Sequence, residues 1–298
     1  MVVGRPVVHL RSVPHTAPQP DVHDPQQESQ LLYGERVRVV REENDWTQIE
    51  ALEQAEFTHN NRWEGYPGWV PSHTLVPEQT VRIPTIVVTA KWAPTWRDAH
   101  RTQPTALRFA IGTLLNGVDF GGALWKVEMA DGSTVWLEGG HARSLREMAA
   151  LGQEEKRRAI LRVAEQFLGD PYVWGGRSPA LVEPSETVTG VDCSGLVNLA
   201  YRAVGIALPR DAHEQYLKAV PVGSPQPADL VFLSERGDPS RIVHVMLYAG
   251  RGELIEGPGT GLRVRRIAVA QRLGQPIASL APDTSVNGQS VFFGTYLP

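Results

Sequence analysis

The chain has very little cysteine: Cys193 is the single one among 298 residues. It can therefore form neither an internal disulfide nor a cysteine-based zinc site. Basic residues are not in excess either. The formal net charge is -4, which argues against non-specific nucleic-acid binding because such binding needs a basic surface. No stretch approaches the roughly 20 apolar residues of a membrane-spanning helix, so we expect no membrane partner.

We do not expect the start of the chain to be a secretory signal. The apolar stretch in residues 1–10 is short, and Pro14, His15 and Pro18 soon interrupt it. If Met1 is the native start, we expect a cytoplasmic protein. A leader removed ahead of Met1 would instead make it secreted or periplasmic. We expect the protein to act as a monomer.

The first half of the chain has the pattern of β-structure. Its strand-like segments alternate in polarity or place Gly and Pro around aromatic residues, and they are residues 35–53, 65–71, 83–90, 107–115 and 125–137. Residues 35–53 contain a polar turn, so they predict a hairpin, and residues 125–137 weakly repeat its pattern. We therefore predict two small β-barrels in tandem, at residues 1–79 and 80–147.

The second half has the pattern of an α+β domain, which we place at residues 148–298. Apolar residues at helical spacing predict a helix over residues 146–169, ended by Gly169-Asp-Pro171, and a second over residues 193–205. A loop rich in Gly, Pro, Ser and Thr separates the helices. Strands are then predicted at residues 230–233, 242–248, 253–256, 262–265 and 291–297. Helices followed by such a run of strands indicate an α+β fold.

Cys193 stands where the turn Thr189-Gly-Val-Asp-Cys-Ser-Gly195 passes into the second predicted helix. A thiol there meets the positive end of the helix dipole and the free N–H groups of the first turn, which favour the thiolate. The same N–H groups could bind the oxyanion of a tetrahedral intermediate. The alternative is that Cys193 is a small buried apolar residue, as lone cysteines often are.

A cysteine nucleophile needs a histidine base from elsewhere in the sequence. We select His244 because it lies in an apolar strand, where alternation places it on one face with Ile242 and Met246. A core histidine satisfied by a backbone carbonyl is the alternative, and His213 is the reserve candidate for the base. The next strand returns beside His244, so we expect Glu256 opposite it, accepting a hydrogen bond from Nδ1.

Five motifs stand in an order that resembles the NlpC/p60-type cysteine peptidases. They are Pro171-Tyr-Val-Trp-Gly-Gly176, Val191-Asp-Cys-Ser-Gly-Leu196, Leu208-Pro-Arg-Asp211, Asp229-Leu-Val-Phe232 and His244-Val-Met-Leu-Tyr248. The resemblance covers about residues 150 to 298. It implies a papain-like core that cleaves cell-wall peptides next to D-glutamate, without a metal or organic cofactor.

The resemblance extends to the first half of the chain. Glu28-Ser-Gln-Leu-Leu-Tyr-Gly-Glu35 and Gly65-Tyr-Pro-Gly-Trp-Val-Pro71 are similar to the SH3-like barrels of bacterial dipeptidyl-peptidases of the γ-D-glutamyl-L-diamino-acid type. In that subfamily the first barrel closes one end of the groove, which then takes only peptides with a free N-terminal L-alanine. The resemblance implies release of L-Ala-γ-D-Glu from a diamino acid such as lysine or meso-diaminopimelate.

The same resemblance assigns roles to individual residues. It makes Cys193 the nucleophile, His244 the base and Glu256 the third catalytic residue, where the family usually has His and sometimes Asn or Gln. Asp192 and Tyr172 match residues of the pocket for the substrate's amino end, where Asp192 would provide the negative charge. The remaining expected substrate-binding residues are Trp174, Ser194, Arg210 and Asp211, with Tyr66 and Glu35 as contacts from the first barrel.

Some residues depart from the family pattern. Ala228 replaces the usual Gly before Asp229, and Ala212 stands where a hydroxyl residue is common. The loop over residues 177–189 is longer than usual and brings Glu183 and Glu186 towards the groove. Two other functions share the motifs: an amidase or acyltransferase that uses the same Cys and His, or a cell-wall-binding protein with an impaired catalytic domain.

Overall fold

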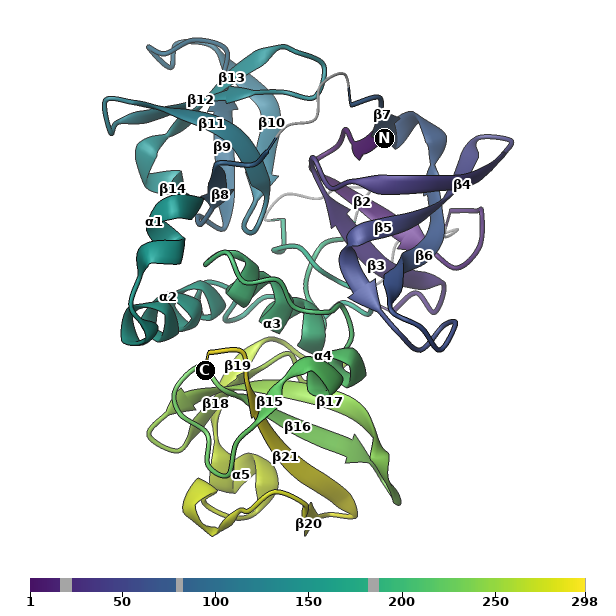
Figure 1. Ribbon diagram of the computed structural model, residues 1–298, viewed down its shortest axis with the longest axis vertical. Helices are drawn as coiled ribbons and strands as arrows, with labels where there is room; N and C mark the ends of the chain where they lie inside the picture. The colour runs from purple at the N-terminus through teal and green to yellow at the C-terminus, as the bar shows by residue number, and fades with distance from the viewer. Residues whose placement is uncertain (17–22, 79–82, 182–187, 298) are drawn as a thin grey trace.

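The computed structural model describes residues 1–16, 23–78, 83–181 and 188–297. Figure 1 shows two β-sheet units beside each other, with a third unit of helices and strands below both. This mixture of elements confirms the predicted α+β class. Among the described residues, no helix is long and apolar enough to cross a membrane.

The first unit is built around a five-stranded antiparallel sheet in the order β3-β2-β6-β5-β4, and β1 pairs with β7 beside it. The strands are β1 (Val2–Val3), β2 (Val7–Arg11), β3 (Gln27–Leu32), β4 (Val37–Glu43), β5 (Trp46–Glu56), β6 (Glu64–Pro71) and β7 (Leu75–Val76). The predicted hairpin is β4–β5, and Asn44 makes its turn with a positive φ of 53°, which Asn tolerates better than most residues.

The second unit is a seven-stranded sheet in the order β10-β9-β13-β12-β11-β8-β14. Its strands are β8 (Ile86–Val88), β9 (Trp92–Trp96), β10 (Pro104–Ala110), β11 (Leu114–Phe120), β12 (Leu124–Glu128), β13 (Thr134–Glu138) and β14 (Ala142–Ser144). The predicted strand over residues 107–115 is wrong, because Gly112, at φ 83°, turns the chain between β10 and β11. That both units are SH3-like barrels stays a prediction.

The third unit packs helices on a sheet in the order β15-β21-β16-β17-β18-β19. Its helices are α1 (Leu145–Ala150), α2 (Gln153–Glu165), α3 (Cys193–Arg202), α4 (Ala212–Lys218) and α5 (Val269–Leu273). Its strands are β15 (Val220–Pro221), β16 (Leu230–Glu235), β17 (Asp238–Gly250), β18 (Glu253–Glu256), β19 (Arg265–Ala268), β20 (Thr284–Val286) and β21 (Gln289–Thr295).

Two predicted elements of this unit need correction. The single helix expected over residues 146–169 is two helices, α1 and α2. Leu151 and Gly152 are extended between them, and the Gly152 N–H donates to the Glu155 carboxylate as the N-cap of α2. Glycine disfavours a helix interior, so the break falls there. The strand expected at residues 262–265 begins later, as β19.

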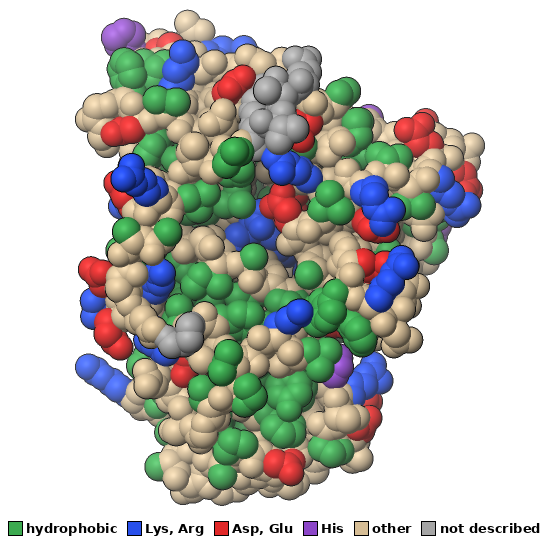
Figure 2. All heavy atoms as spheres, viewed as in Figure 1, with side chains coloured by type: hydrophobic (Ala, Val, Ile, Leu, Met, Phe, Trp, Pro, Cys, Tyr) green, Lys and Arg blue, Asp and Glu red, His purple; other side chains and the backbone are tan. Residues whose placement is uncertain are grey.

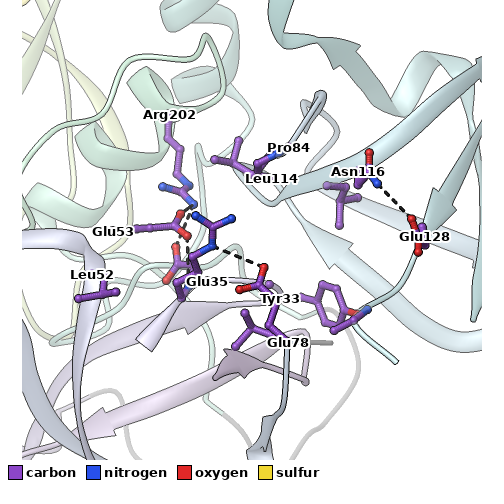
Figure 3. Close-up of a pocket in the computed structure, with 15 residues that line it drawn as sticks. Tyr33, Glu35, Leu52, Glu53, Glu78, Pro84, Leu114, Asn116, Glu128 and Arg202 are labelled. Carbon is purple, nitrogen blue, oxygen red and sulfur yellow. Dashed lines mark hydrogen bonds and ion pairs between the residues drawn. The ribbon is translucent and has the colours of Figure 1, made fainter. Parts of the chain in front are cut away.

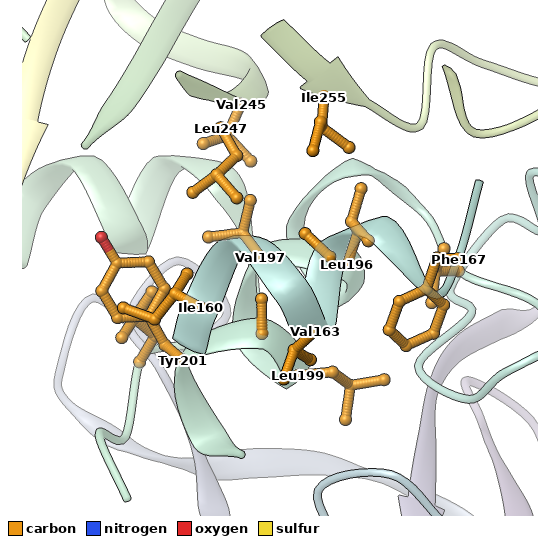
Figure 4. Close-up of a cluster of buried hydrophobic side chains, with 14 of the residues drawn as sticks. Ile160, Val163, Phe167, Leu196, Val197, Leu199, Tyr201, Val245, Leu247 and Ile255 are labelled. Atoms are coloured by element: carbon orange, nitrogen blue, oxygen red, sulfur yellow. The ribbon is translucent and has the colours of Figure 1, made fainter. Parts of the chain in front are cut away.

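Helix α3 forms the centre of the molecule because every one of its residues is buried. Figure 4 shows Leu196, Val197 and Leu199 of α3 between helix α2 and side chains of β17 and β18. The same cluster includes Leu32 from the first unit and Ile111 from the second. A helix that is buried on all sides needs cover on all sides, and the two β-sheet units provide part of it.

Candidate active site

A cleft of about 300 Å³ lies between the first unit and the helices α3 and α4. Its lining residues come from the first and third units: Gln27, Glu28, Thr58, Tyr66, Tyr172, Trp174, Gly175, Asp192, Cys193, Ser194, Asp211, Ala212, His213, Glu214, Arg241, Ile242 and Val243. Most of the residues that the sequence singled out as binding substrate therefore meet in one place. Cys193 is part of the wall, with 8% of its surface exposed.

Cys193 is the first residue of α3, and Asp192 is its N-cap. The Asp192 side chain accepts from the Gly195 N–H at 2.6 Å, as helix N-caps commonly do. A Cβ at Gly195 would lie 2.1 Å from the Gly176 carbonyl oxygen, so only glycine lets the segment ending at Gly176 pack against this turn. The sequence thus fixes the thiol at the positive end of a buried helix.

His244 lies on β17, close enough to Cys193 for the thiol to raise its pKa. Its Nε2 donates to Glu256 Oε2 at 2.9 Å. The expected bond from Nδ1 to Glu256 is therefore wrong: Nε2 makes that contact, which leaves Nδ1 for the thiol. His244 is mostly buried, with 12% of its side chain exposed.

A β-bulge changes the predicted faces of β17. The pairing with β16 shifts between Leu233–His244 and Ser234–Ile242, so Val243 has no partner of its own. Ile242 consequently packs in the cluster around α3, whereas Met246 packs in the cluster on the other side of the sheet. The expectation that Ile242 and Met246 share a face with His244 fails for Ile242 because one extra residue reverses the alternation.

The register of the β17–β18 hairpin also differs from the prediction. Leu247 pairs with Ile255 and Tyr248 with Leu254. Continued along the strands, this register puts Glu256 beside Met246, on the diagonal from His244 and not directly opposite it. Diagonal neighbours on one face are within reach of long side chains, so the contact still forms.

The pKa values of His244 and Glu256 move in opposite directions. Burial alone would lower the His244 pKa, but hydrogen bonds to Cys193 and Glu256 outweigh it and raise the pKa to about 9. Burial would raise the Glu256 pKa, but His244, Arg272 and Arg265 outweigh it and lower the pKa to about 2. The imidazole is therefore charged and the carboxylate ionised at neutral pH.

Arg210 neutralises the carboxylate that the sequence assigned to the substrate's amine. It is fully buried, and its Nη2 donates to Asp192 Oδ2 at 2.7 Å while Nη1 reaches Oδ1 at 3.1 Å. Nε and Nη1 also donate to the hydroxyls of Ser29 and Ser194. Arg210 therefore fixes the N-cap of α3 and joins the first unit to it, without lining the cleft itself.

Tyr66 contacts two carboxylates of the cleft, Asp211 and Glu28, that are less fully neutralised than Asp192. Its hydroxyl donates to Asp211 Oδ2 at 2.9 Å and lies 3.4 Å from Glu28 Oε2. Asp211 keeps 39% of its side chain exposed, and Arg210 Nη1 is 3.5 Å from its Oδ1. The enclosed site raises the Asp211 pKa to about 6, and neighbouring Asp192 and Glu214 add to the effect.

Comparison with known proteins identifies a family match over the region that contains these site residues. The profile of the NlpC/P60 family matches residues 169–275, which contain Cys193, His244 and Glu256. Residues 169–275 form an NlpC/P60 domain. The chain is accordingly a cysteine peptidase, and peptides are its substrates.

The similarity to curated relatives extends beyond residues 169–275. The chain is 28% identical to the gamma-D-glutamyl-L-lysine dipeptidyl-peptidase of Bacillus cereus, over 78% of this chain and 67% of that protein. It is 28% identical to the enzyme of the same name from Bacillus subtilis, over 83% and 77%. The crystal structure of an NlpC/P60 family protein from Bacillus cereus superposes over 100% of this chain and 99% of that one, with a TM-score of 0.78 at 23% identity.

Glu35 does not contact the cleft of the NlpC/P60 domain, contrary to the prediction. Its carboxylate is buried 2.8 Å from Arg177 Nη1 and 3.3 Å from Arg202 Nη2, and it accepts from Gln54. Figure 3 shows Glu35 and Arg202 on the wall of a different cavity, of about 410 Å³, between the two β-sheet units. Glu35 therefore ties the first unit to the NlpC/P60 domain and lies away from the cleft that contains Cys193.

Several cleft residues were missed from the sequence. Glu28 begins the motif Glu28-Ser-Gln-Leu-Leu-Tyr-Gly-Glu35, but the predicted substrate contact in that motif was Glu35, seven positions further on. Glu214 lies on α4, an unpredicted helix, and its carboxylate accepts from the Thr58 hydroxyl and N–H. His213, the reserve base, lines the cleft, and its Nδ1 accepts from the Ile242 N–H. The long loop with Glu183 and Glu186 lies outside the described residues.

The aromatic residues of the first motif, Tyr172 and Trp174, line the cleft. Tyr172 is 7% exposed, and burial together with the nearby charges of Cys193 and Asp192 raises its pKa, so its hydroxyl stays a donor. Trp174 leaves 46% of its surface exposed, and its carbonyl accepts from the Gln27 side chain of the first unit. Figure 2 shows acidic and basic side chains interspersed over this view of the molecule, which agrees with its small net charge.

Proposed function

We propose that the protein hydrolyses the γ-D-glutamyl–diamino acid bond of peptidoglycan stem peptides that carry a free N-terminal L-alanine, and releases L-Ala-γ-D-Glu. One observation carries this proposal. The cleft that contains Cys193 is bounded by residues of the first unit, and the carboxylates of Glu28 and Asp211 gather there around Tyr66. Enclosed carboxylates favour an ammonium and disfavour an amide nitrogen.

The names of the relatives support the same bond. Two proteins that align with most of this chain are dipeptidyl-peptidases for a γ-D-glutamyl-L-lysine linkage. A dipeptidyl-peptidase cuts after the second residue from a free amino terminus, which requires a wall just beyond the amino group of the first residue. Glu28, Thr58 and Tyr66 of the first unit line the cleft, and we infer that they form this wall.

In the proposed mechanism, Cys193 and His244 act as a thiolate–imidazolium pair. The thiolate attacks the γ-carbonyl carbon of D-glutamate, and the backbone N–H of Cys193 and the Tyr172 hydroxyl donate to the oxyanion. His244 Nδ1–H then gives its proton to the leaving amine of the diamino acid. Water attacks the thioester, His244 accepts its proton, and the dipeptide leaves. Glu256 holds the imidazole through Nε2 in every step.

This mechanism predicts the alkaline limit of activity. The pair contains an imidazolium, which is present below the His244 pKa and is lost as the pH rises through about 9. Glu256 does not set the acid limit, because its pKa of about 2 keeps it ionised in any ordinary assay. We expect kcat/KM to be high at neutral pH and to fall above about pH 9. An alkaline limb near the ordinary histidine value of 6.5 would contradict this account.

The substrate is tested by mass spectrometry of the products from L-Ala-γ-D-Glu-L-Lys and L-Ala-γ-D-Glu-meso-diaminopimelate. Each peptide is compared with its N-acetylated form. We expect L-Ala-γ-D-Glu from the free peptides, and acetylation should lower kcat/KM at least about 100-fold, because a site built for a polar group rejects analogues that cannot pair with it. Equal cleavage of free and acetylated peptides would remove the dipeptidyl specificity.

Variants of Glu28 and Asp211 test where the amino group of the substrate binds. Glu28→Gln and Asp211→Asn should each lower kcat/KM for the free peptide about 10-fold or more, since a charge-assisted hydrogen bond is lost. Neither variant should change the rate for the acetylated peptide by as much. Glu50→Gln is the matched control, because Glu50 belongs to the same unit but pairs with Arg38 on the surface. An effect of Glu50→Gln as large as that of Glu28→Gln would contradict the assignment.

A further inference from the structure

The carboxylate of Glu256 has more partners than His244 alone. Glu256 is fully buried, and Arg265 donates to its Oε1 through Nε at 3.0 Å and Nη2 at 2.7 Å. Arg272 Nε lies 3.0 Å from Oε2 and 3.2 Å from Oε1. Oε2, the oxygen that binds His244, is therefore shared between the imidazole and the Arg272 guanidinium.

The two arginines come from the segment that follows the His244 hairpin. Arg265 is the first residue of β19 and pairs directly with Glu256 of β18. Arg272 lies in the last turn of α5. Neither lines the cleft. They contact the carboxylate of Glu256 from outside the cleft. The Arg265 side chain is 41% exposed and the Arg272 side chain is 25% exposed.

We propose that Arg265 and Arg272 are positioning residues that act on His244 through Glu256: they hold the carboxylate in place and offset its charge. The proposal rests on the proposed roles of Cys193 and His244. It explains how a glutamate can stand where the family that the sequence resembles usually has His and sometimes Asn or Gln. With both guanidiniums bound, Glu256, Arg265 and Arg272 together carry a net charge of +1, so His244 gains an oriented acceptor without a dominant negative field.

The alternative arrangements are physically worse. A buried glutamate without the arginines would be costly to ionise, and its unscreened charge would hold the imidazolium proton too firmly for transfer to a leaving amine. The charged groups that contact His244 or its acceptor are Cys193 on α3, Glu256 on β18, Arg265 on β19 and Arg272 on α5. Removing either guanidinium takes positive charge from this set and should stabilise the imidazolium.

The first test uses two single variants, Arg272→Gln and Arg265→Gln. The alkaline limb of kcat/KM should move to higher pH by about one unit, because a nearby charge typically shifts a pKa by one to three units and both arginines are partly exposed. We expect kcat at neutral pH to fall about 10-fold with KM unchanged, since neither residue lines the cleft. Arg272→Lys, which keeps the charge but not the fork, should keep the limb in place.

Arg266→Gln is the matched control. Arg266 follows Arg265 on β19 but points to the other side, where its Nη1 is 3.0 Å from Glu253 Oε2 and its Nη2 pairs with Glu165. This variant removes an arginine of similar exposure from the same strand without touching Glu256. Its pH profile should match that of the unaltered protein. A shift as large as that of Arg272→Gln would overturn the proposal.

A reciprocal variant separates positioning from general support of the fold. In Glu256→Gln the two guanidiniums face an imidazolium without a carboxylate between them, so we expect kcat to fall about 100-fold. Removing Arg272 as well should then restore activity, about 10-fold above Glu256→Gln alone. Residues that merely support the fold would give losses that add, and a double variant less active than Glu256→Gln would overturn the proposal.

Alkylation of the single cysteine by iodoacetamide tests the proposal without any substrate. The upper step in the pH dependence of this reaction should follow His244 and should move upward in Arg272→Gln, but not in Arg266→Gln. If the step moves while no stem peptide is cut, the arginine contacts act as proposed and the substrate assignment is wrong. If stem peptides are cut but neither the step nor the alkaline limb moves, the role of the arginines is wrong and the proposed function stands.

Discussion

Replacing Cys193 with alanine is expected to lower kcat by at least about 10⁴-fold, because covalent catalysis loses its nucleophile and the rest of the triad cannot replace it. The fold should be almost unaffected. Cys193 is at the wall of the cleft, so losing its sulfur leaves no closed cavity, and we expect the free energy of unfolding to change by about 1 kcal/mol or less. Turnover of L-Ala-γ-D-Glu-L-Lys and a denaturant titration measure the two effects.

His244→Ala provides the comparison for this prediction. It should abolish turnover to a similar extent, and the double variant should be no worse than either single one, since residues of one catalytic unit do not contribute additively. The chain has no second cysteine that could take over. Residual turnover in Cys193→Ala within about 10-fold of the unaltered protein would mean that the cleft uses a different nucleophile.

Replacing Arg210 with methionine is expected to lower the free energy of unfolding by about 3 to 5 kcal/mol, because it leaves the Asp192 carboxylate without its buried partner. Arg210 is fully buried and also donates to Ser29 and Ser194, so its loss disturbs the N-cap of the catalytic helix and the contact with the first unit. The shift of the urea unfolding midpoint measures this change, and kcat should fall with it.

Two further variants check the cause. Arg38→Met removes an exposed guanidinium that pairs with Glu50, and such surface pairs contribute about 1 kcal/mol or less. The double variant Arg210→Met with Asp192→Asn should lose less stability than Arg210→Met alone, because the unpaired charge is gone. If Arg210→Met were no more harmful than Arg38→Met, the pair with Asp192 would not hold the N-cap in place.

The residues nearest the reaction could be predicted because their signals are local in the sequence. A glycine-bearing turn that enters an apolar helix places Cys193, and one polar ring in an apolar strand identifies His244. Glu256 could be reached because it lies only one hairpin away. The atom that contacts it could not, since the β-bulge at Val243 and the register of β17 with β18 depend on pairing with neighbouring strands.

Contacts between units were beyond the sequence. Glu28 and Glu35 both belong to the same quoted motif, and only the packing of the first unit on the NlpC/P60 domain directs Glu28 to the cleft and Glu35 to Arg177. Likewise, no local pattern shows that Arg210 neutralises Asp192 from 18 residues away. Buried ion pairs between distant segments are set by tertiary structure, which the periodicity of a single element does not encode.

The measurement that tests the central claim most directly is a mass spectrum of the enzyme quenched in acid during turnover of L-Ala-γ-D-Glu-L-Lys. The account predicts a thioester on the peptide that contains Cys193, with the added mass of L-Ala-γ-D-Glu less one water, and no adduct from the N-acetylated peptide. An adduct on another residue, an added lysine in the acyl group, or turnover in Cys193→Ala without any adduct would contradict it.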